Sequence, residues 1–122
     1  MLIKGGRTMI DYTNPTEKLE DLISEKIEKT SQLKFAINDH ISLKLKYKKE
    51  SNDLLLNTDF KEATGESRPT VAMKEAYIEN KLYDLLVQLE ISKENVSCIK
   101  KEIELIDNYI SLYEYVIQLE LK

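Results

Sequence analysis

Several residue types are scarce in this sequence. Its 122 residues include one cysteine, one histidine, two prolines and three glycines, and no tryptophan. A single cysteine excludes an internal disulfide, which is typical of a protein kept in the reducing cytoplasm. No apolar run is long enough to span a membrane, and no signal-peptide pattern opens the chain. We therefore expect a cytoplasmic protein with no membrane partner.

What remains is a composition rich in helix-forming and charged residues. Hydrophobic residues make up 42% of the chain and charged residues 33%, with lysine, glutamate, leucine and isoleucine prominent. This mixture is typical of long helices or coiled coils, and the length fits one domain. The net charge of −4 argues against general nucleic-acid binding, because phosphates attract positive surfaces. The sequence therefore predicts an all-α protein.

Residues 1–13 precede the helical patterns, and we expect them to form a flexible segment. The segment contains two methionines. The stretch KGGR before Met9 could be encoded by a purine-rich tract that resembles a ribosome-binding site. We therefore expect translation to begin at Met9 rather than Met1.

A first long helix is predicted over residues 14–57, within a helical domain of residues 14–122. Asn14 can cap its first turn, Pro15 suits the first helical position, and Glu17 stands where a capping-box carboxylate belongs. Its apolar residues recur at helical spacing. They are Leu19, Leu22, Ile23, Ile27, Leu33, Ile37, Ile41 and Leu45.

A second long helix is predicted over residues 69–121, and it carries the most regular pattern in the sequence. From Ile78 onward, alternate steps of four and three residues meet an apolar side chain at every position except Ser92. Such a heptad pattern predicts the seam of a coiled coil or helical bundle, and we expect it to serve an oligomer. The apolar seam residues are Ile78, Leu82, Leu85, Leu89, Val96, Ile99, Ile103, Ile106, Ile110, Tyr113 and Ile117.

A second apolar stripe flanks this seam. It consists of Leu86, Leu105, Tyr109, Leu112, Val116 and Leu119. Two paired helices share one interface and would leave this stripe in water, which soluble proteins rarely tolerate over a large patch. We therefore expect a long antiparallel helical hairpin that dimerises into a four-helix bundle or forms a higher oligomer. The alternative is that the stripe packs within the hairpin itself.

The two helices are joined by a predicted tip loop, residues 58–68, which is longer than a chain reversal requires. Gly65 can supply a left-handed backbone conformation, and Pro69 suits the first position of the second helix. Phe60 and Arg68 are of residue types that dominate protein interfaces, so the loop is a candidate partner-binding surface. The alternative is that Phe60 tucks between the helix ends and Arg68 bonds to terminal carbonyl groups.

The C-terminal part of the chain is acidic. Beyond Lys101, carboxylates and tyrosines are interleaved, with no further cation until Lys122. These carboxylates could imitate a phosphate backbone, or they could pair with lysines of an antiparallel first helix. The candidate partner-binding residues in the loop and the acidic end are Phe60, Glu66, Arg68, Glu102, Asp107, Tyr109 and Tyr115.

The densest basic cluster consists of Lys44, Lys46, Lys48 and Lys49. These lysines could contact phosphates, and such binding would weaken steeply with salt. They fan out over different faces of a helix, however, and Glu50 and Asp53 follow directly. That arrangement favours a solvated surface.

No residue pattern indicates catalysis. His40 lies between Ile37 and Ile41 near the apolar face, and Cys98 has no histidine in its own helix. The sequence contains no Glu-x-x-His pattern, phosphate-binding loop, nucleophile elbow or dinucleotide fingerprint. We therefore expect no enzyme activity, no metal and no cofactor.

The stretch ATGESRPTVAMKEAYIENKL, residues 63–82, resembles segments of small helical proteins encoded by phages and prophages of low-GC Gram-positive bacteria. The resemblance implies an accessory protein of a phage, acting in replication or against a host defence system. We therefore expect a protein-interaction module that binds and inhibits or redirects a host protein in the host cytoplasm. Two alternatives stay open: a nucleic-acid-binding accessory to phage replication or recombination, and a structural coiled-coil scaffold.

Overall fold

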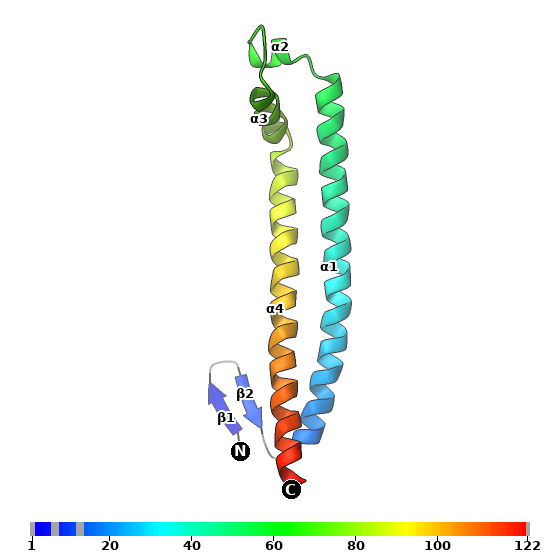
Figure 1. The fold of residues 1–122 in the computed structure, drawn as a ribbon, viewed down its shortest axis with the longest axis vertical. Coiled ribbons are helices and arrows are strands. Elements are labelled where there is room, and N and C mark those ends of the chain that lie inside the picture. The colour runs from blue at the N-terminus through cyan, green and yellow to red at the C-terminus, as the bar shows by residue number, and fades with distance from the viewer. Residues whose placement is uncertain (1, 6–7, 12–13, 122) are drawn as a thin grey trace. The chain divides into compact units, whose positions relative to one another are not determined.

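The computed structural model of the protein describes the backbone of residues 2–5, 8–11 and 14–121 and the side chains of residues 14–121. In the part of the chain that it describes, no helix is both long and apolar enough to cross a membrane. Apart from one pair of short strands, the described residues form helices or connect them, so the prediction of an all-α fold is confirmed. The elements are β1 (Leu2–Gly5), β2 (Thr8–Asp11), α1 (Pro15–Asn57), α2 (Phe60–Thr64), α3 (Val71–Lys81) and α4 (Tyr83–Glu120) (Figure 1).

The two short strands lie in the segment that the sequence predicted to be flexible. β1 pairs with β2 in antiparallel register, with Ile3 opposite Ile10 and Lys4 opposite Met9. Main-chain hydrogen bonds between the strands join residues 2–5 to residues 8–11, and the flexibility expected for the segment stays a prediction. The rest of the predicted segment, residues 1, 6, 7, 12 and 13, lies outside the described residues. Met9, the predicted translation start, belongs to β2.

Helix α1 begins at the predicted signal. Pro15 is its first residue, and the main-chain N–H of Lys18 donates to the carbonyl oxygen of Asn14 at 3.1 Å. The side-chain amide of Asn14 donates to Glu17 Oε2 at 2.5 Å. These two bonds tie the first turn together, although the Asn14 and Glu17 side chains bond to each other rather than to main-chain N–H groups as in the predicted capping box.

The predicted tip loop contains the short helix α2. Asp59 caps its start by accepting a hydrogen bond from the main-chain N–H of Glu62 at 3.3 Å. Gly65 ends it with a φ of +73°, the left-handed conformation that the sequence predicted for this glycine, and its N–H donates to the carbonyl of Lys61 at 3.0 Å. The chain therefore crosses the tip in an ordered, capped turn.

The predicted second helix, residues 69–121, is not continuous. Leu82 has a φ of −103° and a ψ of 22° and separates α3 from α4, although its N–H still donates to the carbonyl of Ile78 at 2.9 Å. No glycine or proline lies between Val71 and Glu120, so the sequence carries no signal for the division. At the start, Thr70 provides the cap and α3 begins at Val71, so Pro69 precedes the helix and is not its first residue as predicted.

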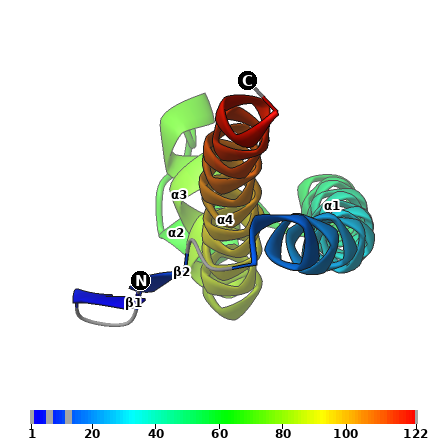
Figure 2. The same ribbon diagram turned by 90° about the horizontal axis from the view of Figure 1, so that it is seen from below.

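The chain divides into two compact units, one formed by Met1–Phe35 with Ser97–Lys122 and the other by Ala36–Val96. Each unit contains a segment of α1 beside a segment of α4 or of α3 and α4, as the side view and the end view agree (Figure 1, Figure 2). The two paired segments run in opposite directions in each unit.

The predicted seam faces inward in both units. Every seventh residue of the seam is buried, and the residues between them are half-buried. This alternation is the pattern that two helices produce when they pack through heptad positions. The buried seam residues are Ile78, Leu85, Ser92, Ile99, Ile106 and Tyr113, and the half-buried ones are Leu82, Leu89, Val96, Ile103, Ile110 and Ile117.

Helix α1 meets the seam with a stripe that matches its predicted apolar residues only in part: Leu19, Leu22, Leu33 and Ile37 are half-buried. Its covered positions include a run at the same steps of three and four: Leu19, Leu22, Lys26, Lys29, Leu33, Ala36, His40, Leu43, Tyr47, Glu50 and Leu54. Lysine can serve in such a stripe because its aliphatic stem covers apolar surface while the ammonium group stays in water. One helix interface admits one stripe, so Ile23, Ile27, Ile41 and Leu45 are left exposed.

Candidate functional site

The tip is held together by an aromatic cluster. Phe60 is only 7% exposed, and its ring meets Tyr77 edge to face with the ring centres 5.8 Å apart. The ammonium group of Lys74 lies 5.5 Å from the centre of the Phe60 ring, and Lys81 lies equally far from that of Tyr77. Phe60 therefore fastens α2 to α3, which corrects the expectation that it offers an exposed aromatic ring to a partner.

The charged residues of the tip do lie in solvent. Glu66 and Arg68 are exposed, and neither forms an ion pair with any residue from 14 to 121. The main-chain N–H of Glu66 donates to Thr64 Oγ1 at 3.4 Å, which ties the loop back to α2. Arg68 is thus the predicted loop residue whose side chain is free to meet a partner's carboxylate or phosphate.

Two ion pairs join α1 to the acidic end of α4. Lys26 Nζ lies 2.6 Å from Asp107 Oδ1, and Lys29 Nζ lies 2.5 Å from Glu102 Oε2. Glu102 also accepts a hydrogen bond of 3.5 Å from Cys98 Sγ. The bond from Lys29, followed by that from Cys98, lowers the pKa of Glu102, and the same bond to Glu102 raises the pKa of Lys29. Glu102 and Asp107 therefore pair within the chain, as one of the two alternatives for the acidic end predicted.

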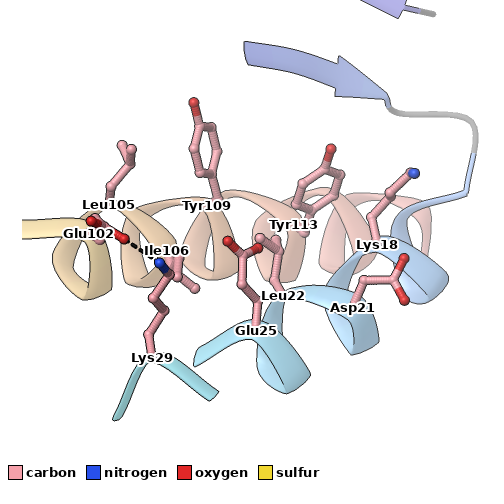
Figure 3. A pocket seen from close by; sticks show the side chains of 10 residues that line it. All are labelled: Lys18, Asp21, Leu22, Glu25, Lys29, Glu102, Leu105, Ile106, Tyr109 and Tyr113. Atoms are coloured by element: carbon pink, nitrogen blue, oxygen red, sulfur yellow. Dashed lines mark ion pairs between the residues drawn. The ribbon is translucent and has the colours of Figure 1, made fainter. Parts of the chain in front are cut away.

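Beside these ion pairs, the unit that contains both chain ends carries a groove of about 470 Å³. Figure 3 shows Leu22 and Ile106 between the two helices, while Leu105 and Tyr109 project from one side of α4. The lining residues on α1 are charged except for Leu22, and those on α4 are apolar or aromatic except for Glu102. The lining residues are Lys18, Asp21, Leu22, Glu25, Lys29, Glu102, Leu105, Ile106, Tyr109 and Tyr113.

Leu105 in this lining belongs to a longer feature of α4. Cys98, Leu105, Leu112 and Leu119 follow one another at seven-residue spacing, and we call this set the α4 stripe. Residues seven apart in a helix lie two turns apart on nearly the same face. Leu105 is 52% exposed and Leu119 50% exposed, Cys98 is exposed, and Leu112 is half-buried. The helices of this unit thus leave a line of apolar side chains in contact with water.

The other unit contains a polar contact in the middle of its seam. His40 Nδ1 lies 2.6 Å from Ser92 Oγ, and the Ser92 hydroxyl donates to the carbonyl of Leu89 at 2.8 Å. Because the Ser92 hydroxyl donates its proton to the Leu89 carbonyl oxygen, its oxygen accepts a hydrogen bond from Nδ1–H of His40. A single polar pair among apolar seam residues fixes the register of two helices, since a shifted alignment would bury both groups without partners.

This histidine and serine do not form a nucleophilic site. Ser92 is 5% exposed, so a substrate cannot reach its hydroxyl, and its proton is bonded to the main chain rather than to a base. Cys98, the other candidate nucleophile, bonds to Glu102. Among the described residues, no three His, Cys, Asp or Glu side chains gather closely enough to hold a metal ion.

The basic cluster on α1 is exposed. Lys44, Lys46, Lys48 and Lys49 all lie in solvent, and within residues 14–121 none of them forms an ion pair. Their spacing spreads them around α1, because successive helical residues turn by about 100°. Tyr47, in the middle of the cluster, is half-buried, and burial together with the nearby charge of Glu79 raises its pKa.

The sequence did not predict the charged side chains of the groove or the contact of His40 with Ser92. The groove could not be predicted because it depends on which stripe of α1 packs against α4. For the contact of His40 with Ser92, the one available signal was that Ser92 is the polar residue of the seam. Tyr109 lies in the groove, while Tyr115 is 59% exposed.

Comparison of the chain with protein-family models, with curated proteins and with solved structures gives no match.

Proposed function

We propose that this chain is a protein-interaction module that works without a catalytic site and self-associates through the α4 stripe, as a dimer that completes a four-helix bundle. The observation that carries the proposal is the exposed line of apolar side chains beside the groove. Burial of such surface is the main driving force of protein association. Among residues 14–121, the packing of α1 on α4 leaves Leu105 52% exposed and Leu119 50% exposed.

The burial of residues 14–121 supports this proposal. Among residues 14–121 no side chain is less than 2% exposed, although 42% of the sequence is hydrophobic. Exposed apolar side chains are ordinary when scattered, but a continuous line of them marks a site of interaction. The regular spacing of the α4 stripe is the spacing that another helix would fill.

The groove favours a helix as the occupant. Leu105 and Tyr109 on α4 supply its apolar and aromatic side chains, and α1 supplies charged ones, of which Asp21 and Glu25 form no ion pair with any described residue. An amphipathic helix fits such a site, because one face can cover Leu105 and Tyr109 while its polar edge meets the carboxylates. A second copy of this chain carries such a helix in α4.

We further propose that the assembled module binds and inhibits or redirects a host protein and is encoded by a phage. The resemblance of residues 63–82 to phage-encoded helical proteins supports this, and Arg68 with Glu66 offers exposed charge for the contact. Nucleic-acid binding is the less favoured function, because the four lysines on α1 do not gather on one face.

The proposed self-association is tested by Leu105→Gln with Leu112→Gln. We expect the unmodified chain to sediment as a dimer and the variant as a monomer with unchanged helix content. Each leucine loses about 1 kcal/mol of burial. Four leucines in a dimer then give about 4 kcal/mol, or about a thousandfold in dissociation constant.

The matched control is Leu55→Gln with Leu56→Gln. These α1 leucines are 49% and 80% exposed, so their change removes at least as much exposed apolar surface from outside the α4 stripe. The control should remain a dimer. An unmodified chain that sediments as a monomer at every concentration would contradict the proposal, and so would equal dissociation of both variants.

A further inference from the structure

We infer that the α1 row, which consists of Ile37, Ile41 and Leu45, binds an acidic amphipathic helix of another protein. This inference rests on the proposed binding of a host protein, and it adds the surface of this chain and the chemistry of the partner. Two observations carry it. Apolar side chains are exposed in a line on α1, and the same side of this helix carries lysines without carboxylates.

The α1 row lies within the unit of residues 36–96. Ile41 is 48% exposed and Leu45 is 62% exposed, while Ile37 is half-buried. The three residues are four apart, so each lies about 40° around the helix from the one before and roughly 6 Å further along it. They therefore form a narrow apolar line, which the packing of α1 on α3 and α4 leaves in contact with water.

The charges of α1 within this unit are separated by sign around the helix. At about 100° per residue, the lysines of one group lie within about 80° of Ile41, and no carboxylate of residues 36–57 does. The carboxylates lie about 120° or more from Ile41, as Lys46 does. The lysines are Lys44, Lys48 and Lys49, and the carboxylates are Asp39, Glu50 and Asp53. The three lysines are exposed and form no ion pair with any residue from 14 to 121.

The neighbouring helices add charges of both signs. Glu90 and Lys93 of α4 line a groove of about 380 Å³ together with Lys44. Burial, and then the charge of Glu79 on α3, raise the pKa of Tyr47. None of these three charged residues forms an ion pair with a described residue. They contribute one positive and two negative charges, so the lysines of α1 keep the surface around the α1 row positive.

This surface fits an acidic helix better than other partners that bind lysine. A helix packs alongside another through side chains three and four residues apart, and carboxylates at the edges of its apolar face can pair with the lysines. A nucleic acid would set phosphates against the apolar line. A second copy of the α1 row would set lysines against lysines.

A membrane surface is also a poorer fit. Helices that lie on membranes use a large apolar face that includes aromatic residues such as tryptophan and phenylalanine. Residues 36–57 contain neither, and Tyr47 is half-buried. The narrow α1 row instead has the width that one partner helix covers.

Binding of two synthetic peptides to the full chain tests the inference. Both are amphipathic helices of about four heptads with leucine at the seam positions, one with glutamate and the other with lysine at the edge positions. Fluorescence anisotropy should show that the acidic peptide binds, that added salt weakens its binding, and that the basic peptide does not bind. Binding of the basic peptide as tightly as the acidic one would overturn the inference.

Two variants test whether the acidic peptide binds at the α1 row. Ile41→Gln with Leu45→Gln should weaken its binding about thirtyfold, because two apolar side chains are lost from the contact. Lys44→Gln with Lys48→Gln should weaken it about tenfold at low salt, because two ion pairs at the edge of the contact are lost.

Each variant has a matched control on exposed residues that do not lie on the side of α1 that carries the row. Phe35→Gln with Val71→Gln is the control for the apolar pair, and Lys46→Gln with Lys100→Gln is the control for the lysines. Both controls should bind the acidic peptide as the unmodified chain does. Equal weakening by a variant and its control would overturn the inference. Binding to vesicles of phosphatidylserine and phosphatidylcholine, but not to the acidic peptide, would also overturn it.

Sedimentation of the same samples separates this inference from the proposed self-association. A chain that dimerises and does not bind the acidic peptide overturns the inference and leaves self-association standing. A chain that stays monomeric and binds the acidic peptide at the α1 row supports the inference and contradicts self-association.

Discussion

The tip, formed by α2 and α3, buries a large apolar side chain, whereas the α4 stripe exposes its large apolar side chains to water. At the tip, Phe60 is 7% exposed because Tyr77 and Lys74 close around it, whereas Leu105 in the stripe is 52% exposed. Phe60 looked like a binding residue from its position in a loop, and Leu105 looked like part of a helix. An aromatic residue in a loop between helices can therefore pack against the neighbouring helices of its own chain instead of contacting a partner.

The tip also has exposed apolar residues, but they do not form a line. Val71 and Met73 are two residues apart on α3, and Leu55 and Leu56 are neighbours on α1, so in each case the side chains point to different sides of the helix. The α4 stripe repeats on one face over three heptad steps. Periodicity, rather than exposure alone, separates a surface for a partner helix from scattered apolar residues.

Phe60→Ala should have the largest effect on folding stability. Removal of a buried phenylalanine ring typically costs about 3 kcal/mol or more, and here it also removes the contact with Tyr77. Urea unfolding should show this loss, and hydrogen exchange should become faster in α2 and α3. Self-association should be unchanged, because the tip is not part of the proposed dimer contact.

The control for this variant is Phe35→Ala. Phe35 is 75% exposed, so its replacement should change the free energy of unfolding by less than about 0.5 kcal/mol. If Phe60→Ala instead dissociated the dimer without destabilising the chain, the assignment of the tip as a structural cluster would be wrong.

Ser92→Ala should have an intermediate effect. It removes the acceptor of the His40 Nδ1–H inside the seam, and a buried polar group without a partner costs about 1–2 kcal/mol. Urea unfolding of the variant measures this loss. Ser42→Ala, at an exposed position of α1, is the control and should be neutral. Equal stability of the Ser92 variant and the unmodified chain would show that the hydrogen bond does not hold the register.

Glu102→Gln should have the smallest effect, and the effect should depend on pH. The folded chain lowers the pKa of Glu102 below its ordinary value of 4.5, so the bond to Lys29 contributes stability above pH 4.5 and loses it as the pH falls through the lowered pKa. Thermal unfolding should therefore separate the variant slightly from the unmodified chain at neutral pH.

The two proteins should become alike in strong acid, where Glu102 is protonated. Added salt should also reduce their difference, because the pair is partly exposed. Glu104→Gln is the control, since Glu104 is exposed and has no ion pair with a described residue. A larger difference in acid than at neutral pH would contradict the assigned role of Lys29.

The sequence predicted the helices best where their ends carry local chemistry. Asn14, Pro15 and Gly65 act through their own backbone and nearest neighbours, so their roles could be read directly. The seam from Ile78 to Ile117 was also predictable, because one heptad pattern runs through it. The strands β1 and β2 were missed, although two short runs with glycine between them are a hairpin signal.

The remaining errors arise because the sequence of one helix does not determine which of its residues the partner helix covers. Both Leu33 and Ile27 fit a helical rhythm, and only the partner helix decides which stripe of α1 is covered. Lys26 and Lys29 therefore occupy contact positions that the apolar pattern of the first helix did not include. The division at Leu82 has no glycine or proline to announce it, and the burial of Phe60 depends on Tyr77 from another helix.

The most direct test of the proposed dimer contact compares two leucines that are equally exposed in one chain. Leu105 is 52% exposed and Leu55 is 49% exposed, so a soluble paramagnetic agent should relax their methyl signals equally in a monomer. We predict that in the unmodified protein at high concentration the Leu105 methyl groups are protected and those of Leu55 are not. Equal relaxation of both leucines would contradict the claim that a second copy covers the α4 stripe.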